Sequence, residues 1–167
     1  MRKEGVKVAN SKIKTNAMRI LDKAKVNYNL YNYDSNGEAV DGVSVAHMIG
    51  KPEEQVFKTL VTQGASREFY VFVIPVAKEL DLKAAARSVG EKSVEMIKVA
   101  DINKITGYVR GGCSPVGMKK SYKTVIDAAC ENVDTIIVSA GKIGYQIEIK
   151  PKELVELVRG EIESIIH

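Results

Sequence analysis

A glycine-rich segment is the part of this sequence best suited to chemistry. Residues 106–120 read TGYVRGGCSPVGMKK and contain four glycines and one proline. Glycine lets a backbone adopt positive φ and approach a ligand closely, and successive N–H groups in such a loop can bind an anion or an oxyanion. The segment lacks the GxxxxGK[ST] and GxGxxG patterns of nucleotide-binding loops. A plain Gly/Pro connection between two strands explains the composition equally well.

A lysine supplies the second feature. Lys58 lies in the segment VFKTL, near the start of an apolar stretch. A lysine in such a place either points to solvent from a sheet edge or projects into a site from a rigid strand. Solvation is the usual outcome, because lysine is rarely buried without a partner. Lys58 therefore indicates a site only in combination with other features.

Conventional catalytic sets are absent from the sequence. The two cysteines, Cys113 and Cys130, and the two histidines, His47 and His167, are far apart and show no metal-ligand spacing. We expect His47 on the apolar face of a short helix, where it is structural. Ser114 has no GxSxG context and no histidine assigned to activate it. An enzyme built this way must depend on positioning and backbone electrostatics, or on a nucleophile that the substrate supplies.

The periodicity of the chain predicts the elements that would position these residues. We expect the first helix to begin at Thr15 or Asn16. Further helices are expected over residues 43–48, 83–89, 100–105 and the stretch from Pro151 to Ile165. The expected strands cover residues 29–34, 57–62, 68–76, 124–128, 135–139 and 145–149. Strands in runs with irregularly interspersed helices predict a single α+β domain, with a mixed, mostly antiparallel central sheet covered by helices. We expect the domain to span residues 14–167 and residues 1–13 to form a basic mobile extension.

Composition restricts the class of protein. The chain has 167 residues, a formal net charge of +4, no Trp and 6% aromatic residues. So few aromatic rings argue against a general single-strand binder, although the mild positive charge permits a phosphate-rich partner near Lys119, Lys120 and Lys123. We expect no DNA partner. With no apolar segment at the start and no run long enough to span a membrane, the predicted location is the cytoplasm, without membrane association.

Several motifs taken together are similar to one family. The chain resembles the YbaK/EbsC family of Cys-tRNA(Pro) deacylases, whose relatives include the editing domain inserted in bacterial prolyl-tRNA synthetases. The order and spacing agree from about residue 14 to the end. The matching segments are KTNAMR (14–19), VFKTL (56–60), PVA (75–77), DLK (81–83), SVEM (93–96), the whole loop 106–120, IDA (126–128), VSAGK (138–142) and Gly144.

The resemblance implies removal of an aminoacyl group from the acceptor end of a transfer RNA, by a hydrolase or lyase reaction without metal or cofactor. Lys58 corresponds to the family's essential lysine, which holds the 3′ end or the ester, and Gly111 to the glycine whose N–H polarises the ester carbonyl. In Cys-specific members the substrate thiol is proposed to attack its own ester, which agrees with the missing nucleophile–base pair. The residues implied to bind substrate are Tyr33, Thr59, Gly112, Ser114, Pro115, Ser139 and Gln146.

Two departures from the family pattern leave the amino-acid specificity open. Gln146 stands where Cys-specific members carry aspartate, and Ala140 where they carry a second glycine. The alternatives are a deacylase for Ala-tRNA(Pro) or another small amino acid, a non-catalytic aminoacyl-tRNA or synthetase-associated module, and a small-molecule ester hydrolase. Prolyl-tRNA synthetase is an expected partner that would supply tRNA selectivity. Cys113 stands where other members of the family carry an aliphatic residue, and it is expected to line the pocket.

Overall fold

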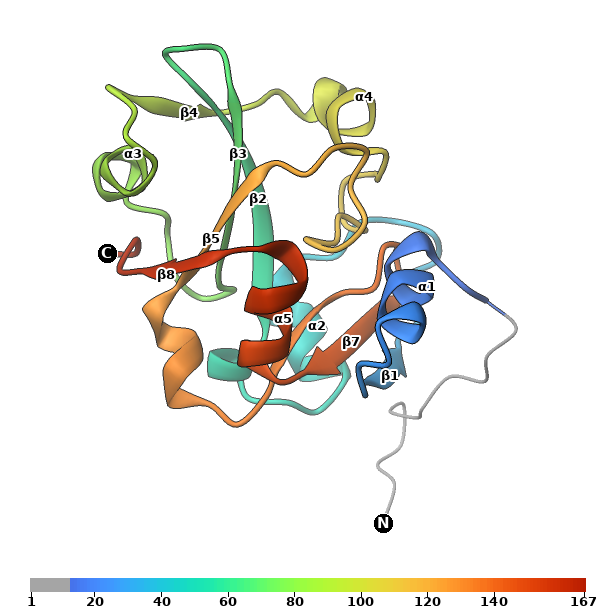
Figure 1. Ribbon diagram of the computed structural model, residues 1–167. Coiled ribbons are helices and arrows are strands. Elements are labelled where there is room, and N and C mark those ends of the chain that lie inside the picture. The colour runs from blue at the N-terminus through green and yellow to red at the C-terminus, as the bar shows by residue number, and fades with distance from the viewer. Residues whose placement is uncertain (1–12) are drawn as a thin grey trace.

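The computed structural model describes residues 13–167, which form two β-sheets with helices packed on them (Figure 1). The three-stranded sheet has the order β1-β7-β6, and the five-stranded sheet has the order β4-β2-β3-β5-β8. A parallel bridge between Val56 and Ile137 joins the two sheets. The predicted α+β class with mixed, mostly antiparallel pairing is confirmed. The predicted basic extension lies, except for Ile13, outside the described residues.

The three-stranded sheet separates two apolar clusters. Its strands are β1 (Asn29–Asn32), β6 (Ile136–Ser139) and β7 (Tyr145–Ile149), all antiparallel. One face packs against α1 (Asn16–Lys23), and the other face packs against α2 (Gly42–Met48). Because side chains alternate between the faces of a strand, this sheet presents one set of residues to α1 and another set to α2.

The five-stranded sheet is mixed. Its strands are β2 (Phe57–Gly64), β3 (Phe69–Pro75), β4 (Val94–Met96), β5 (Lys123–Asp127) and β8 (Glu161–Glu163). β2 pairs antiparallel with β3 and β4, whereas the β3–β5 and β5–β8 pairs are parallel. β3 lies at the centre, and its residues 71–74 are at most 1% exposed. Helix α3 (Leu82–Val89) packs on one face and α5 (Pro151–Val158) joins the core on the other.

Local capping signals explain where the helices begin and end. The Thr15 hydroxyl accepts a hydrogen bond from the Met18 N–H at the start of α1, and Asp81 caps α3 in the same way. Gly90 ends α3 in the left-handed conformation at φ +73°, and Gly107 ends α4 (Ile102–Thr106) at φ +86°. The remaining helical turns are short 3₁₀ segments, η1 (Glu53–Gln55), η2 (Val99–Asp101) and η3 (Ala128–Asn132).

Two sequence predictions are wrong. The expected helix from Pro151 to Ile165 ends at Val158, Arg159 adopts φ +53°, and β8 follows after Gly160. Gly160 lowers helix propensity, and pairing with β5 satisfies backbone groups at what would otherwise be a free sheet edge. His47 does not lie on an apolar face: its ring is 66% exposed and contacts Glu53 Oε2 at 2.9 Å.

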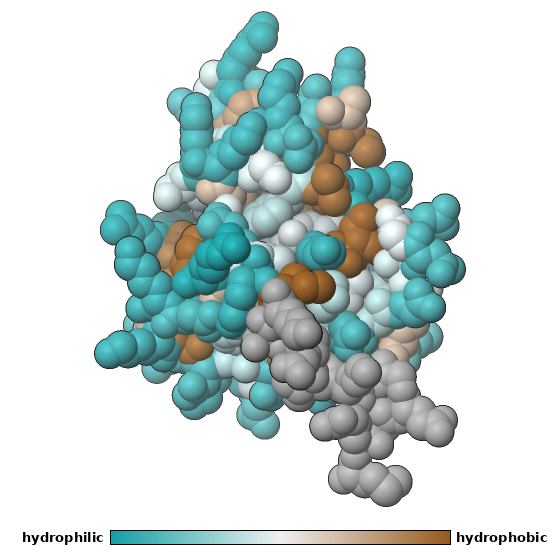
Figure 2. All heavy atoms as spheres, turned by 90° about the vertical axis from the view of Figure 1, so that its right-hand side faces the viewer, coloured by the Kyte–Doolittle hydropathy of each residue, from teal (hydrophilic) through white to brown (hydrophobic). Residues whose placement is uncertain are grey.

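The surface of the described residues is mixed. Figure 2 shows apolar patches separated by hydrophilic side chains on the face that carries α1 and α4. Within residues 13–167 no helix combines the length and the hydrophobicity needed to cross a membrane. The large apolar residues that are more than one third exposed are Met48, Leu82, Met96, Val99 and Val109.

Candidate active site

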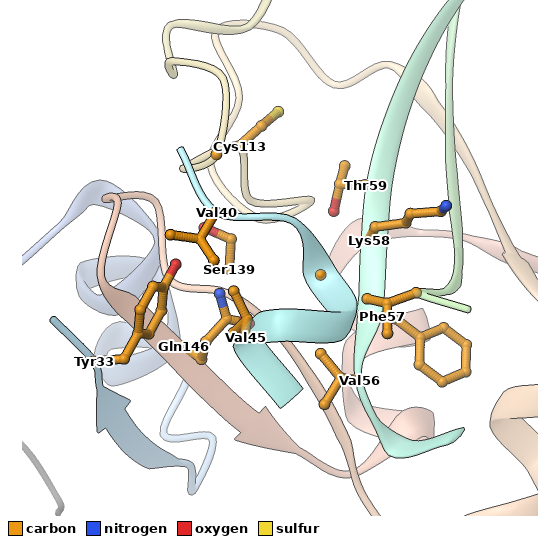
Figure 3. Close-up of a pocket in the computed structure, with 13 residues that line it drawn as sticks. Tyr33, Val40, Val45, Val56, Phe57, Lys58, Thr59, Cys113, Ser139 and Gln146 are labelled. Carbon is orange, nitrogen blue, oxygen red and sulfur yellow. The ribbon is translucent and has the colours of Figure 1, made fainter. Parts of the chain in front are cut away.

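A cavity of about 140 Å³ opens where the two sheets meet (Figure 3). Its walls come from the start of β2, the α2 face of the small sheet, α2 itself and the glycine-rich loop. This arrangement collects residues that are more than one hundred positions apart in the chain. The lining residues are Tyr33, Val40, Gly42, Val45, Val56, Phe57, Lys58, Thr59, Val76, Gly111, Cys113, Ser139 and Gln146.

An unpaired stretch of strand edge forms one wall. β4 pairs only with residues 62–64 of β2, and beyond it the Ile97 N–H donates to the Val61 carbonyl at 3.2 Å. The Val61 backbone groups therefore point away from β3. Because backbone groups of an antiparallel strand alternate in direction with a period of two, the N–H and C=O of Thr59 also point away from β3. Among residues 13–167 nothing pairs with these two groups, so the strand presents a donor and an acceptor beside the cavity.

The Thr59 side chain adds a second polar group. Its hydroxyl oxygen is buried and has no hydrogen-bond partner within residues 13–167. Figure 3 shows this hydroxyl directed from β2 toward the interior of the pocket. A buried hydroxyl without a protein partner costs roughly 1–3 kcal/mol, and this oxygen is available to hydrogen-bond a molecule that enters the pocket.

The small sheet supplies the polar wall on the opposite side. Gln146 on β7 lies directly between Tyr31 on β1 and Ser139 on β6, so these side chains share the α2 face. The Ser139 hydroxyl accepts from the Gly141 N–H at 3.2 Å, and the Tyr33 N–H is bound to the Gly144 carbonyl at 2.9 Å. The turn between β6 and β7 therefore fixes the positions of both hydroxyl-bearing side chains.

The glycine-rich loop closes the pocket through Gly111. This residue has φ +83°, a conformation that side chains disfavour, and a Cβ there would lie 2.8 Å from the Cβ of Ala39. Its N–H has no hydrogen-bond partner within residues 13–167. The adjacent Gly112 packs against the Lys142–Ile143 backbone, where a Cβ would lie 2.8 Å from the Ile143 nitrogen. The loop thus brings an unpaired donor to the cavity.

Hydrogen bonds hold this loop and the neighbouring strand end in place. The Tyr108 hydroxyl donates to the Val116 carbonyl at 2.7 Å, and Asn16 of α1 donates to the Gly117 carbonyl at 2.8 Å. The Thr15 hydroxyl donates to the Ala140 carbonyl at the end of β6. Helix α1 therefore supports two walls of the pocket without lining it.

Lys58 lies at the rim. Its register partner on β3 is Ile74, which belongs to the apolar cluster under α3, whereas Thr59 lies opposite Val73 in the cluster on the other face. Figure 3 accordingly shows the Lys58 amino group directed away from Tyr33 and Ser139. It has no ion-pair partner among the described residues, and it alone of the lining residues carries a charge. This cation is free to meet an anionic ligand.

The structure collects most of the sequence-predicted residues. Tyr33, Lys58, Thr59, Gly111, Ser139 and Gln146 line the cavity, as does Cys113. The other three predicted residues, Gly112, Ser114 and Pro115, do not line it. Ser114 is fully buried and accepts from the Val116 N–H at 3.2 Å, and Pro115 faces a separate groove beside α1 and α5. These three residues shape the loop.

Sequence reasoning missed the apolar wall. Val40, Val45, Val56, Phe57 and Val76 line the pocket, although nothing in their types distinguishes them from core residues. The structure alone explains the glycine at position 42, because a Cβ there would lie 2.3 Å from Val76 Cγ1. This glycine lets the start of α2 approach the end of β3.

Burial raises the pKa of the Cys113 thiol to about 11. At pH 7.5 only about one thiol in a few thousand is then ionised. We expect alkylation of Cys113 by iodoacetamide to be far slower than that of a free cysteine, and to accelerate about tenfold per pH unit up to pH 10, since the thiolate is the reactive form. Mass spectrometry of the modified residue measures this rate. Rapid labelling at pH 7 would instead identify an activated thiol.

Comparison with known proteins supports one family. The family model described as "Aminoacyl-tRNA editing domain" matches residues 38–157. A protein of Enterococcus faecalis with the provisional name Cys-tRNA(Pro)/Cys-tRNA(Cys) deacylase EbsC is 43% identical over 152 residues, which cover 91% of this chain and 93% of that protein.

Two solved structures share the fold. One, a protein without an assigned function, has a TM-score of 0.82 at 21% identity and covers 92% of this chain and 100% of its own. The other, described provisionally as a trans-editing enzyme for prolyl-tRNA synthetase, has a TM-score of 0.79 at 20% identity and covers 93% and 99%. The sequence match spans α2 to α5 and includes all the pocket residues except Tyr33. The chain therefore belongs to the aminoacyl-tRNA editing domain family.

Proposed function

We propose that this protein is a trans-acting deacylase that removes cysteine wrongly attached to tRNA(Pro). The 43% identity to the Enterococcus protein named for Cys-tRNA deacylation supports the substrate. The observation that carries the reaction type is the pocket itself, which combines the Gly111 N–H with the Thr59 hydroxyl, neither of which has a partner among residues 13–167. Hydrogen-bond donors fixed before substrate binds are suited to stabilising the oxyanion of an ester under attack.

The residues suggest a division of tasks. The aminoacyl group enters the cavity, the Gly111 N–H donates to the ester carbonyl oxygen, and Lys58 at the rim holds a phosphate of the acceptor end. The substrate thiol forms a bond from sulfur to the carbonyl carbon, the bond from that carbon to the ribose oxygen breaks, and the thiol proton passes to the ribose oxygen. The products are a thiolactone and uncharged tRNA, and no nucleophile of the protein is consumed. A prolyl-tRNA synthetase partner that selects the tRNA is part of the same proposal.

Single-turnover deacylation tests this function directly. Purified protein in excess is mixed with Cys-tRNA(Pro), Ala-tRNA(Pro) or Pro-tRNA(Pro), and the remaining aminoacyl-tRNA is measured with time. We expect rapid loss of cysteine and stable proline. Release of alanine in preference to cysteine would reassign the substrate to a smaller amino acid. Stability of all three esters, with tRNA binding retained, would contradict catalysis.

The Thr59 hydroxyl provides a further test. Because this oxygen lacks a partner within residues 13–167, Thr59→Val removes an unsatisfied buried group and should leave the melting temperature equal or slightly higher. The same change should lower the single-turnover rate constant about tenfold, the effect of one lost hydrogen bond worth roughly 1.4 kcal/mol. Thr59→Ser keeps the hydroxyl and should retain most of the rate. A structural role would produce the opposite pattern, with lower stability and unchanged rate.

A further inference from the structure

The interior of the pocket lacks a negative charge. None of the described residues that line it is Asp or Glu, and Lys58, which is charged, directs its amino group away from Tyr33 and Ser139 (Figure 3). The polar groups that remain on the small-sheet wall are the hydroxyls of Tyr33 and Ser139 and the side-chain amide of Gln146. These are all neutral hydrogen-bonding groups.

Gln146 is the least expected of the three. It is 6% exposed, lies on the middle strand of its sheet, and is directed into the space beside Ser139 and Tyr33 (Figure 3). Within residues 13–167 its side-chain amide has no protein hydrogen-bond partner, and its atoms are not among the buried unpartnered ones, so they reach the open space of the cavity. The amide is therefore available to hydrogen-bond a ligand that enters the pocket.

The chemistry of the amide restricts which partner it takes. An α-ammonium group buried without a carboxylate is disfavoured, because burial in a medium of low polarity penalises the charged form. The free α-amino group titrates near pH 7.7–8.0, so its neutral form is readily available. A neutral amine both donates and accepts hydrogen bonds, as an amide does, and a hydroxyl of similar size does the same.

We propose that this pocket binds the acyl group with its α-amine uncharged, and that it therefore also deacylates tRNA esterified with the 2-hydroxy acid analogue of cysteine, which keeps the attacking thiol. Gln146 is the residue that permits this wider substrate class. The inference rests on the deacylase function proposed above. The α-ammonium group loses its proton to solvent before it binds. The substrate thiol then attacks the carbonyl carbon and the bond to the ribose oxygen breaks, as in the amino ester, and the α-substituent stays attached to its carbon throughout.

The test compares two substrates on the same tRNA(Pro): cysteine, and the hydroxy-acid analogue of cysteine in which a hydroxyl replaces the α-amino group. Since both carry the same thiol, the ratio of their single-turnover kcat/KM values isolates the α-substituent. We expect the two values to agree within about fivefold at pH 8.5. Below the amine pKa the amino-to-hydroxy ratio should fall about tenfold per pH unit, as the neutral amine becomes scarce.

Gln146→Glu introduces a carboxylate of nearly the same shape. In this variant the amino ester should be preferred by at least about tenfold at pH 6.5, because the carboxylate now favours the ammonium form. Gln63→Glu places the same charge on β2 outside the cavity and should leave the ratio unchanged. If Gln146→Glu fails to fold in a thermal melt, the pH dependence of the unmodified protein decides.

The outcomes separate the two proposals. Cleavage of the amino ester with the hydroxy ester more than a hundredfold slower at pH 8.5, or a ratio that does not change with pH, would overturn the neutral-amine inference alone. Failure to cleave either ester would overturn the deacylase function and this inference with it.

Discussion

Lys58→Ala is expected to lower the single-turnover rate of deacylation by at least about a hundredfold, or about 2.7 kcal/mol of transition-state stabilisation. Lys58 alone among the described lining residues is charged, and it has no ion-pair partner within residues 13–167. Its removal would leave only neutral residues among those that line the cavity. Rapid-quench measurement with protein in excess over Cys-tRNA(Pro) gives the rate directly.

Two variants define the role of this lysine. Lys78→Ala removes an equally charged but exposed side chain just after β3 and should keep the unmodified rate. Lys58→Arg preserves the cation and should therefore retain a measurable fraction of activity. Since arginine cannot serve as a base at neutral pH, this result would assign the lysine the role of a cation. A Lys58→Ala rate within threefold of the unmodified protein would show that the cation is dispensable.

Gly111→Ala should nearly abolish turnover. The backbone at this position has φ +83°, and an added Cβ would lie 2.8 Å from the Ala39 Cβ and 2.9 Å from its Cα. The loop must therefore move, and the Gly111 N–H moves with it. Loss of one such donor at an oxyanion site typically lowers kcat about a hundredfold to a thousandfold. The measurement is the same single-turnover rate, together with the melting temperature.

Gly90→Ala is the matched control for backbone strain. Gly90 has φ +73° but no atom within 4 Å of the site of a Cβ. Both variants pay about 1–2 kcal/mol for a left-handed alanine, so both should unfold at a lower temperature. Only Gly111→Ala should lose activity. Equal loss of activity in the two variants would attribute the effect to stability and contradict a role for the Gly111 N–H.

Elements with local signals could be predicted from the sequence. Thr15 and Asp81 mark the starts of α1 and α3, and Gly90 marks an end, because capping depends on the backbone groups of a single turn. The β2–β3 hairpin is likewise predictable from the sequence, since two apolar segments flank a short turn. The order of the strands within the two sheets was not predicted.

Elements that depend on distant pairing could not be read from the sequence. β8 is three residues long and exists because β5 offers it an edge, while Ile165 donates to Asp127 across 38 positions at 2.9 Å. Its one apolar residue, Ile162, fits a helical stripe with Leu154, Val158 and Ile165, and this pattern underlies the wrong prediction. β4 is as short, and no period can be recognised in three residues.

The site shows the same division. The residue types of Lys58 and Gly111 indicate possible chemistry, but their assignment to one pocket depends on family resemblance. Ser114 belongs to the same loop, yet its hydroxyl turns inward to the Val116 N–H. The direction of the backbone changes between Gly111 and Ser114, and this change decides whether a side chain faces the pocket or the core. Amino-acid composition does not reveal that direction.

The segment that defines the family is shorter than the unit that holds the two sheets together. The matched residues 38–157 exclude α1, β1 and β8, yet β1 and β8 are outer strands of the two sheets and α1 anchors the pocket loop. A fragment cut at those limits would expose a bare strand edge on each sheet, a recognised cause of aggregation. It would also discard Tyr33. Engineers who graft this module into another protein should therefore take its borders from the sheet edges rather than from the stretch shared among relatives.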